Sequence, residues 1–331
     1  MPCWAISLIG GIPPALQLAV ASPAIRILLI GTALLSLKSL SAQTNPAVET
    51  SRLFDRSAPP TGGMVTPDGM ALPEGESATS EDESFGAQQI LKTQQKIPDF
   101  TLGGSVSGFY TNNVALTRSH TISDSFLVGA AFFSWTPRIN PELQFQFGAA
   151  ASIFRYWDTT PLNFENLGTG VGLLWTPRNF WGIGILGRYD FTELLDTASN
   201  KILQDHEFSV ALQKLLVLGR SHSLTFGVVG SAGISDPFSE QRDQIGFAVG
   251  YHLQLTRQLG SDLGYRLSGY FYNKGGRDDL NQVFSLGLHY YITPWASLDS
   301  FLTGAANSSN RSAFRYDVIS TGGGAGLTVR F

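Results

Sequence analysis

From Asp99 to the final Phe331, the chain consists of segments in which apolar residues alternate with small or polar ones. In the clearest segment, 243–256, positions 245, 247, 249, 251, 253 and 255 are apolar or aromatic, and those between them are small or polar. Successive side chains of a β-strand point to opposite faces, so this pattern predicts strands with an apolar and a polar environment on their two faces. At roughly ten to twelve residues, the segments have the length of strands that cross a membrane in a barrel.

Twelve segments show this pattern: 100–112, 125–136, 142–155, 165–176, 180–192, 206–217, 222–234, 243–256, 262–274, 281–293, 296–306 and 317–331. Short connectors such as 177–179 and 219–221 alternate with longer polar ones such as 192–205 and 307–316. Outer-membrane barrels place short turns in the periplasm and long loops outside. The sequence therefore predicts an all-β, antiparallel up-and-down transmembrane barrel of about twelve strands over residues 99–331, with both termini in the periplasm.

Two segments fit the pattern poorly. Both faces of 125–136 are apolar, and in 206–217 the apolar face carries Lys214. Either a bulge shifts the register in these strands or the assignment of their faces is wrong.

Composition supports a membrane barrel and argues against other classes. Residues 99–331 hold 35 of the 38 aromatic residues, many near the expected strand ends, as the two interfacial girdles of a barrel require. The alternative is that aromatic residues simply favour strands. A mean hydropathy of +0.05 is too low for a protein made of apolar helices, and a net charge of −4 argues against a nucleic-acid partner.

The last strand ends in Gly326-Leu-Thr-Val-Arg-Phe331, in which Leu327, Val329 and Phe331 share a face. In this alternation and in its terminal Phe, the chain resembles the bacterial outer-membrane β-barrel superfamily, without resolving a family; the segments 104–114 and 307–310 are also similar to export-associated barrels. The resemblance implies an outer membrane of the Gram-negative type and Phe331 as the signal read by the barrel-assembly machinery. Membrane lipid and lipopolysaccharide are then the expected surroundings.

Residues 1–98 divide into two parts. In 1–42, Arg26 precedes an apolar run and small residues ending at Ala42, which indicates a signal peptide rather than a transmembrane anchor, because Pro23 and Arg26 shorten the apolar stretch. Residues 43–98 contain eight acidic residues and only two aromatic ones, a composition typical of a flexible periplasmic leader. Residues 84–96 within it have the composition of a short helix that ends before Pro98.

No pattern in the sequence predicts an enzyme, a metal site or a cofactor. The five histidines are dispersed, and His252 and His289 lack an obvious third ligand. The closely spaced glycines near 168–172 resemble a phosphate-binding loop, but no helix follows them. Small residues on the inner wall of a barrel are the better explanation.

The alternation places a set of polar residues on the expected inner face. The candidates are Arg188, Asp190, His252, Arg266, Tyr270, Tyr272, His289 and Arg330. An arginine on the lipid face at mid-depth would cost about 2–4 kcal/mol, so Arg188 and Arg266 should point inward. There they either line an aqueous path or pair with acids such as Asp190.

Three functions fit these features. About twelve strands lie between barrels filled by side chains and open porins, which favours a passive or weakly selective channel for small solutes. The main alternative is a structural, assembly or export-associated barrel with a blocked lumen. An autotransporter-like translocator with 84–96 in the lumen is a third, although the leader is short for a passenger.

Overall fold

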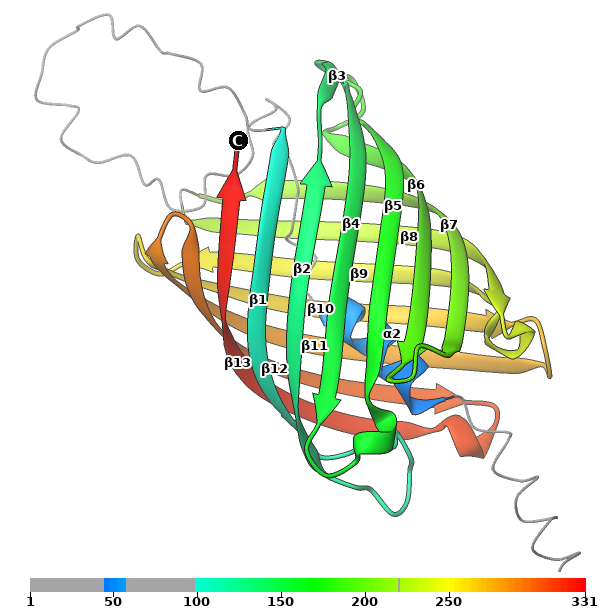
Figure 1. Cartoon of the computed structure of the whole chain (residues 1–331). Coiled ribbons are helices and arrows are strands. Elements are labelled where there is room, and N and C mark those ends of the chain that lie inside the picture. Colours follow the sequence, from blue (N-terminus) through cyan, green and yellow to red (C-terminus); the bar gives the residue numbers. More distant parts are fainter. Residues whose placement is uncertain (1–44, 58–98, 220) are drawn as a thin grey trace, which may run out of the picture. The chain divides into compact units, whose positions relative to one another are not determined.

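The computed structural model describes residues 45–57, 99–219 and 221–331, which form a closed antiparallel β-barrel that holds one helix (Figure 1). The helix is α2 (Pro46–Ser57). The strands are β1 (Phe100–Thr111), β2 (Asp124–Trp135), β3 (Arg138–Asn140), β4 (Leu143–Tyr156), β5 (Phe164–Trp175), β6 (Ile183–Asp196), β7 (Lys201–Val217), β8 (His222–Asp236), β9 (Arg242–Gln254), β10 (Leu259–Tyr272), β11 (Arg277–Thr293), β12 (Ala296–Ser309) and β13 (Tyr316–Arg330). Three short 3-10 helices lie in connectors: η2 (Thr160–Leu162), η3 (Phe238–Glu240) and η4 (Ser312–Phe314).

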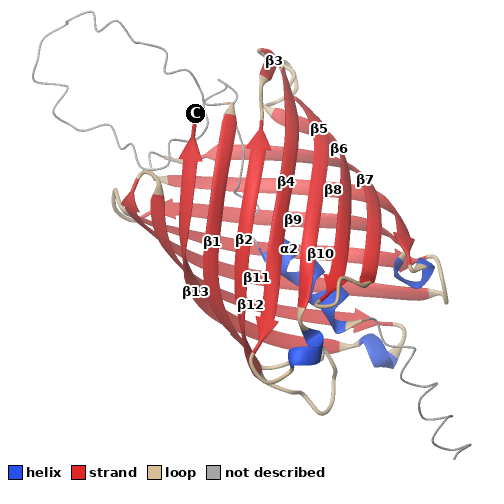
Figure 2. Ribbon diagram, in the orientation of Figure 1, coloured by secondary structure: helices blue, strands red, loops and turns tan. Residues whose placement is uncertain are grey.

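Twelve of these strands make the barrel wall, and the predicted fold class is confirmed. Each wall strand pairs with the next along the chain, while β3 only extends the turn between β2 and β4 (Figure 2). The wall closes where β1 pairs with β13. There the backbones of Phe100 and Phe331 exchange two hydrogen bonds of 3.1 and 3.0 Å, and the two rings stack with centroids 5.7 Å apart.

We call the end where β1 begins and β13 finishes the terminal end, and the other the far end. The expected contrast between short and long connectors is weak, because several strands continue further at the far end than the sequence indicates. The predicted loop 192–205 is wrong: β6 and β7 pair as far as Leu195 and Lys201. Asp196 stabilises the remaining tight turn, since its Oδ1 accepts 2.8 Å hydrogen bonds from the amides of Ala198 and Asn200.

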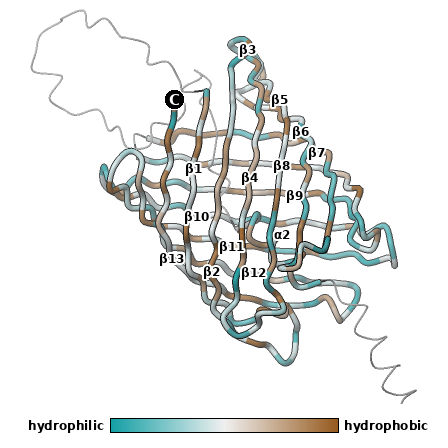
Figure 3. Tube along the Cα trace, viewed as in Figure 1, coloured by the Kyte–Doolittle hydropathy of each residue, from teal (hydrophilic) through white to brown (hydrophobic). Residues whose placement is uncertain are grey.

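The two faces of the wall differ as a membrane barrel requires. Large apolar side chains such as Val106, Phe208 and Leu327 are exposed on the outward face, and hydropathy changes from residue to residue along the strands (Figure 3). An apolar surface of this extent is matched to lipid rather than to water. Among the described residues, none of the helices is long and apolar enough to span a membrane.

Neither of the two doubtful strands contains a register shift in the doubtful segment. β2 pairs continuously with β1 and β4, so its two apolar faces are real. In β7, Lys214 lies on the outward face opposite Ile183, the first residue of β6, and hence close to the terminal end. A lysine there can extend its ammonium group to the membrane interface.

Helix α2 lies inside the barrel (Figure 1). Its start follows local rules: the side-chain Oδ1 of Asn45 caps the amide of Ala47 at 3.0 Å, Pro46 occupies the first turn, and Glu49 suits the positive end of the helix dipole. The acidic leader therefore contains an ordered helix, α2, that was not predicted from the sequence. The predicted signal peptide 1–42 and helix 84–96 lie outside the described residues.

Candidate functional site

Apolar residues of α2 pack against the inner wall on two sides. Val48 is fully buried in a cluster with Ala47, Val114, Phe126, Val128, Phe154, Tyr156, Phe164, Leu194 and Leu203. Leu53 packs in a second cluster with Leu116, Val283, Ala305, Tyr316 and Val318. The two clusters contain residues from eight wall strands and from the connector that follows β1. The wall therefore surrounds α2, which fills this part of the lumen.

The connector 112–123 holds α2 at the far end. Val114 belongs to the cluster around Val48, and Leu116 to the cluster around Leu53. Asn113 fixes the connector, since its side-chain amide donates to the carbonyl oxygens of Thr117 at 2.7 Å and Asp317 at 2.9 Å. The helix is thereby closed off by a loop that folds inward.

Arg52 of α2 connects the helix to two acidic residues, Asp205 in the wall strand β7 and Glu240 in η3. Its Nη1 donates to Glu240 Oε2 at 3.3 Å, and its Nη2 donates to the Glu240 carbonyl at 3.1 Å and to Asp205 Oδ2 at 3.5 Å. Burial raises the pKa of the Glu240 carboxyl, which lies in the connector between β8 and β9, and the Arg52 guanidinium opposes that rise. A buried ion pair of this kind is costly to break, because the remaining charge stays without its partner.

Glu49, one turn earlier on α2, meets the opposite charge. Its Oε1 accepts a 3.1 Å hydrogen bond from the hydroxyl of Tyr272 and lies 3.8 Å from Nη2 of Arg277. Within the helix the same Oε1 lies 3.9 Å from Nη1 of Arg52. The two charged residues of α2 are therefore adjacent, and each faces a wall group of opposite charge.

Arginine and tyrosine side chains alternate along the wall beside Glu49. The Arg242 guanidinium lies 3.9 Å from the centre of the Tyr270 ring and donates to the Tyr272 hydroxyl at 3.3 Å. Arg277 lies 4.0 Å from the Tyr272 ring centre and also bonds Asp279. Stacking on aromatic rings stabilises guanidinium groups in a dehydrated place. We call Arg242, Tyr270, Tyr272 and Arg277 the arginine–tyrosine ladder.

A second polar network crosses four strands nearer the terminal end. Asp262 Oδ1 lies 2.8 Å from His252 Nδ1, and Asp262 Oδ2 lies 3.1 Å from His289 Nε2. His289 Nδ1 lies 2.7 Å from Asp299 Oδ1. Carboxylate oxygens only accept, so both ring nitrogens of His289 act as donors in this arrangement. Within the described part of the chain, no cluster of three or more ligating side chains has the geometry to hold a metal ion.

The structure places the eight candidate residues of the inner face in three pairs and two separate positions. Tyr270 and Tyr272 are brought to α2, while His252 and His289 join the network around Asp262. The others are Arg188 and Asp190, which pair with each other at 2.7 Å, Arg266, whose register partners are Ala248 and Val283, and Arg330, opposite Thr101 at the terminal end. The eight residues therefore make no single site.

The charged residues around α2 were not predicted from the sequence. The predicted strands 262–274 and 281–293 leave Arg277 and Asp279 in a connector, whereas both are buried on the inner face of β11, which begins at Arg277. One signal did point to α2: the inner face of β2 carries Phe126 and Val128, which a water-filled lumen would not favour. An apolar inner face indicates an apolar partner inside the barrel.

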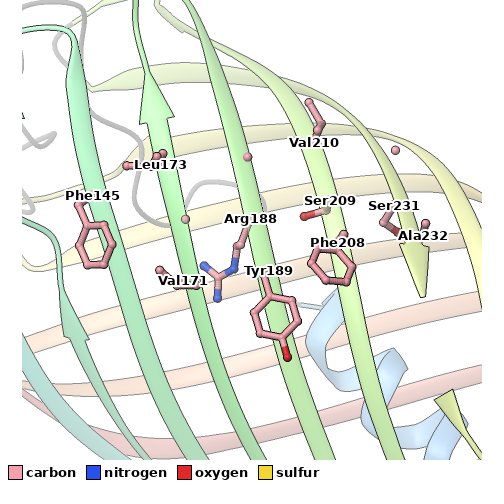
Figure 4. Close-up of a pocket in the computed structure, with 13 residues that line it drawn as sticks. Phe145, Val171, Leu173, Arg188, Tyr189, Phe208, Ser209, Val210, Ser231 and Ala232 are labelled. Carbon is pink, nitrogen blue, oxygen red and sulfur yellow. The ribbon is translucent and has the colours of Figure 1, made fainter. Parts of the chain in front are cut away.

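A groove of about 700 Å³ lies on the outward side of the wall, across β4 to β8. It is open where Gly187 and Gly230 have no side chain, and Figure 4 shows the rings of Phe145, Tyr189 and Phe208 around it. Most of its lining residues are apolar, and the polar ones are Arg188, Tyr189, Ser209 and Ser231. It belongs to the lipid-facing side and is separate from the lumen.

A closed twelve-stranded antiparallel wall with an apolar outward face defines the class: the chain is an outer-membrane β-barrel protein. No family model and no curated protein matches its sequence.

Three solved structures illustrate what the chain is similar to, and only for the first does the TM-score exceed 0.5 and support a shared fold. An outer membrane channel from Pseudomonas putida F1 has a TM-score of 0.52 at 10% identity, over 71% of this chain and 96% of that one. LpxR from Salmonella typhimurium has a TM-score of 0.41 at 13% identity, over 70% and 100%. A KdgM porin in complex with disordered oligogalacturonate has a TM-score of 0.39 at 5% identity, over 68% and 98%. At these identities the likeness concerns the fold alone.

Proposed function

We propose that this barrel is a passive or weakly selective channel for small solutes, and that α2 closes the far half of its lumen until it is displaced. The observation that carries the proposal is the ion pairing of Arg52 with Glu240 and Asp205. These contacts fix a helix that comes from outside the wall sequence, and no covalent link among the described residues holds it there. A helix held in this way can leave while the wall stays closed.

The polar inner face of the terminal half supports a water-filled path. Besides the network around Asp262, it carries the Arg188–Asp190 pair. We propose that the terminal end faces the periplasm, that lipid and lipopolysaccharide surround the outward face, and that the chain acts without catalysis. Solutes would then enter the lumen from either end once α2 has moved.

A second candidate function is a structural, assembly or export-associated barrel with a permanently blocked lumen. The complete burial of Val48 between wall residues favours it, because an apolar core of this kind resembles the interior of a stable domain. In that case α2 belongs to the folded core, and the loops or the leader carry the function.

Single-channel recording in a planar bilayer tests the proposal. The wild type should conduct rarely. Arg52→Glu should conduct often, because it places a third carboxylate between Glu240 and Asp205, and breaking such a buried pair costs about 3–5 kcal/mol. The double variant Arg52→Glu, Glu240→Arg restores opposite charges and should close the channel again.

The control is Arg155→Glu, which disrupts the Arg155–Glu165 pair on the outward face and should leave the currents unchanged. Heat-modifiable migration on gels shows that each variant is folded. Folded Arg52→Glu without currents would exclude the gated channel and leave the blocked barrel.

A further inference from the structure

The wall around α2 contains two adjacent parts of opposite charge. One is acidic and consists of Glu240 and Asp205, which receive Arg52. The other is the arginine–tyrosine ladder, which receives the carboxylate of Glu49. Since Glu49 and Arg52 lie one helical turn apart and 3.9 Å from each other, the two parts of the wall match a carboxylate and a cation held side by side.

This arrangement is more than fixing a helix requires. Removing charged groups from water costs free energy, and well-packed apolar residues often stabilise a buried helix as well as a buried ion pair does. Only 6% of Glu49 and 8% of Arg52 is exposed, so both charges are almost fully removed from water. The groups on the wall are dehydrated and preorganised for a bipolar partner before any solute arrives.

The charge balance of the wall narrows the class of solute. Around α2 the described residues of the barrel include the acidic side chains Asp205, Glu207, Glu240 and Asp279. The basic ones are Arg242, Arg277 and Arg266, the last of which pairs in register with Val283 of the cluster around Leu53. When α2 withdraws, this wall has an excess of negative charge. A simple anion is then disfavoured, while a solute that carries a carboxylate together with one or more cationic groups is complementary.

Building on the channel function proposed above, we infer that this wall is a binding site for solutes of the amino-acid class, and that α2 occupies it as a mimic of the solute. The carboxylate of the solute takes the place of Glu49 at Tyr272 and Arg277. Its ammonium or guanidinium group takes the place of Arg52 at Glu240. Solute and helix therefore compete, and binding of the solute favours the displaced state of α2.

Competition predicts an order of affinities among full-length variants. Glu49→Gln keeps the shape of the side chain but loses a charge-assisted contact worth about 1.5–3 kcal/mol, so α2 should bind its site less firmly and L-arginine should bind about tenfold more tightly than to the wild type. Adding Tyr272→Phe and Arg277→Gln to Glu49→Gln removes the carboxylate-binding groups and should abolish that gain. Glu165→Gln, on the outward face, is the matched control and should behave as the wild type.

Isothermal titration calorimetry of the detergent-solubilised full chain measures these affinities without requiring a current. Two analogues test the two charges separately: agmatine lacks the carboxylate of L-arginine, and pentanoate lacks its cationic groups. Each should bind to Glu49→Gln at least about tenfold more weakly than L-arginine does, since each leaves one buried charge of the site without a partner. Equal binding of agmatine and L-arginine would show that the ladder is no carboxylate site. Absence of L-arginine binding in folded Glu49→Gln would overturn the inference.

The experiments distinguish a failure of the proposed channel function from a failure of the proposed binding site. Currents in Arg52→Glu together with no L-arginine binding would leave a channel without this site. L-arginine binding with no current in any folded variant would leave a binding barrel and remove the channel.

Discussion

The hydroxyl of Tyr272 on the barrel wall donates a 3.1 Å hydrogen bond to the carboxylate of Glu49, which lies 223 residues earlier in the chain. Arg277 lies over the Tyr272 ring and within 3.8 Å of the same carboxylate. This contact connects the helix to the wall strand β10, and its neighbour Arg52 connects it to β7 and η3. Helix α2 is thus held in the lumen by apolar packing and also by polar contacts with residues that are distant in sequence.

Val48→Asp should expel α2. Val48 is completely buried, and a carboxylate in that place has no partner, so docking should lose several kcal/mol. The measurement is trypsin cleavage after Arg52, followed by mass spectrometry of the folded protein in detergent. Cleavage should be slow in the wild type, where Arg52 is buried, and fast in the variant.

Ile139→Asp is the control for this prediction, because it introduces the same charge at an exposed position in β3, in the terminal-end turn between β2 and β4. It should leave cleavage after Arg52 slow. Equal, slow cleavage of folded Val48→Asp would mean that α2 is a permanent part of the core.

The alternating strands could be predicted because each depends on local sequence, and register follows once one face is apolar. The helix could not. Residues 46–57 are polar enough on average to be stable in water as an unstructured segment. They form an ordered helix because they contact residues that are distant in sequence, such as Phe126, Tyr272 and Glu240. Only the apolar inner face of β2 carried information about it, and that face looked like an error of register.

The ends of several strands were also predicted wrongly from the sequence. Pairing between β6 and β7 and between β10 and β11 continues over more residues than a strand needs to cross a membrane. Antiparallel hydrogen bonding does not require lipid, so two strands joined by a tight turn can stay paired outside the bilayer. As a result Arg277 and Asp279, predicted as loop residues, became part of the inner face. A charge at a strand end cannot be assigned to loop or lumen from alternation alone.

Tyr272→Phe should loosen α2 by a small amount. The change removes the hydrogen bond to Glu49 and the one from Arg242 but keeps the ring, so docking should lose about 1–2 kcal/mol and cleavage after Arg52 should rise several-fold. Tyr265→Phe is the matched control, since Tyr265 lies on the outward face and its hydroxyl donates to Gln282 on the neighbouring strand. Indistinguishable cleavage in the two variants would contradict a role of Tyr272 in holding the helix.

In the Val48→Asp background, Arg188→Glu together with Arg266→Glu should make the open channel more cation-selective. Both residues lie on the inner face, where solvent screens charge less well than in bulk. Arg188 is paired with Asp190, so its reversal also leaves two carboxylates side by side. Reversal potentials under a salt gradient measure the effect; clear currents without any shift would place neither arginine on the conducting path.

The mature protein should lack residues 1–41 or 1–42, because Arg26, the apolar run after it and Ala42 form the pattern of a cleaved signal peptide. Intact-mass measurement of protein from outer membranes tests this. Retention of Met1 would contradict secretion by that route.

Deletion of Phe331 should reduce the amount of assembled barrel in the outer membrane, for one of two separable reasons. The residue closes the wall through two backbone hydrogen bonds with Phe100 and a stacked ring, and it also stands at the position that assembly machinery is expected to read. Phe331→Leu keeps the backbone bonds and an apolar side chain but removes the ring.

Two measurements separate these reasons: refolding in detergent, judged by heat-modifiable migration on gels, and the yield of barrel in cell membranes. If both variants refold normally in detergent but give a low membrane yield in cells, the aromatic ring serves recognition. If only the deletion fails, and fails in detergent as well, then Phe331 acts by closing the seam. Normal yield of both variants in cells would show that neither role limits assembly.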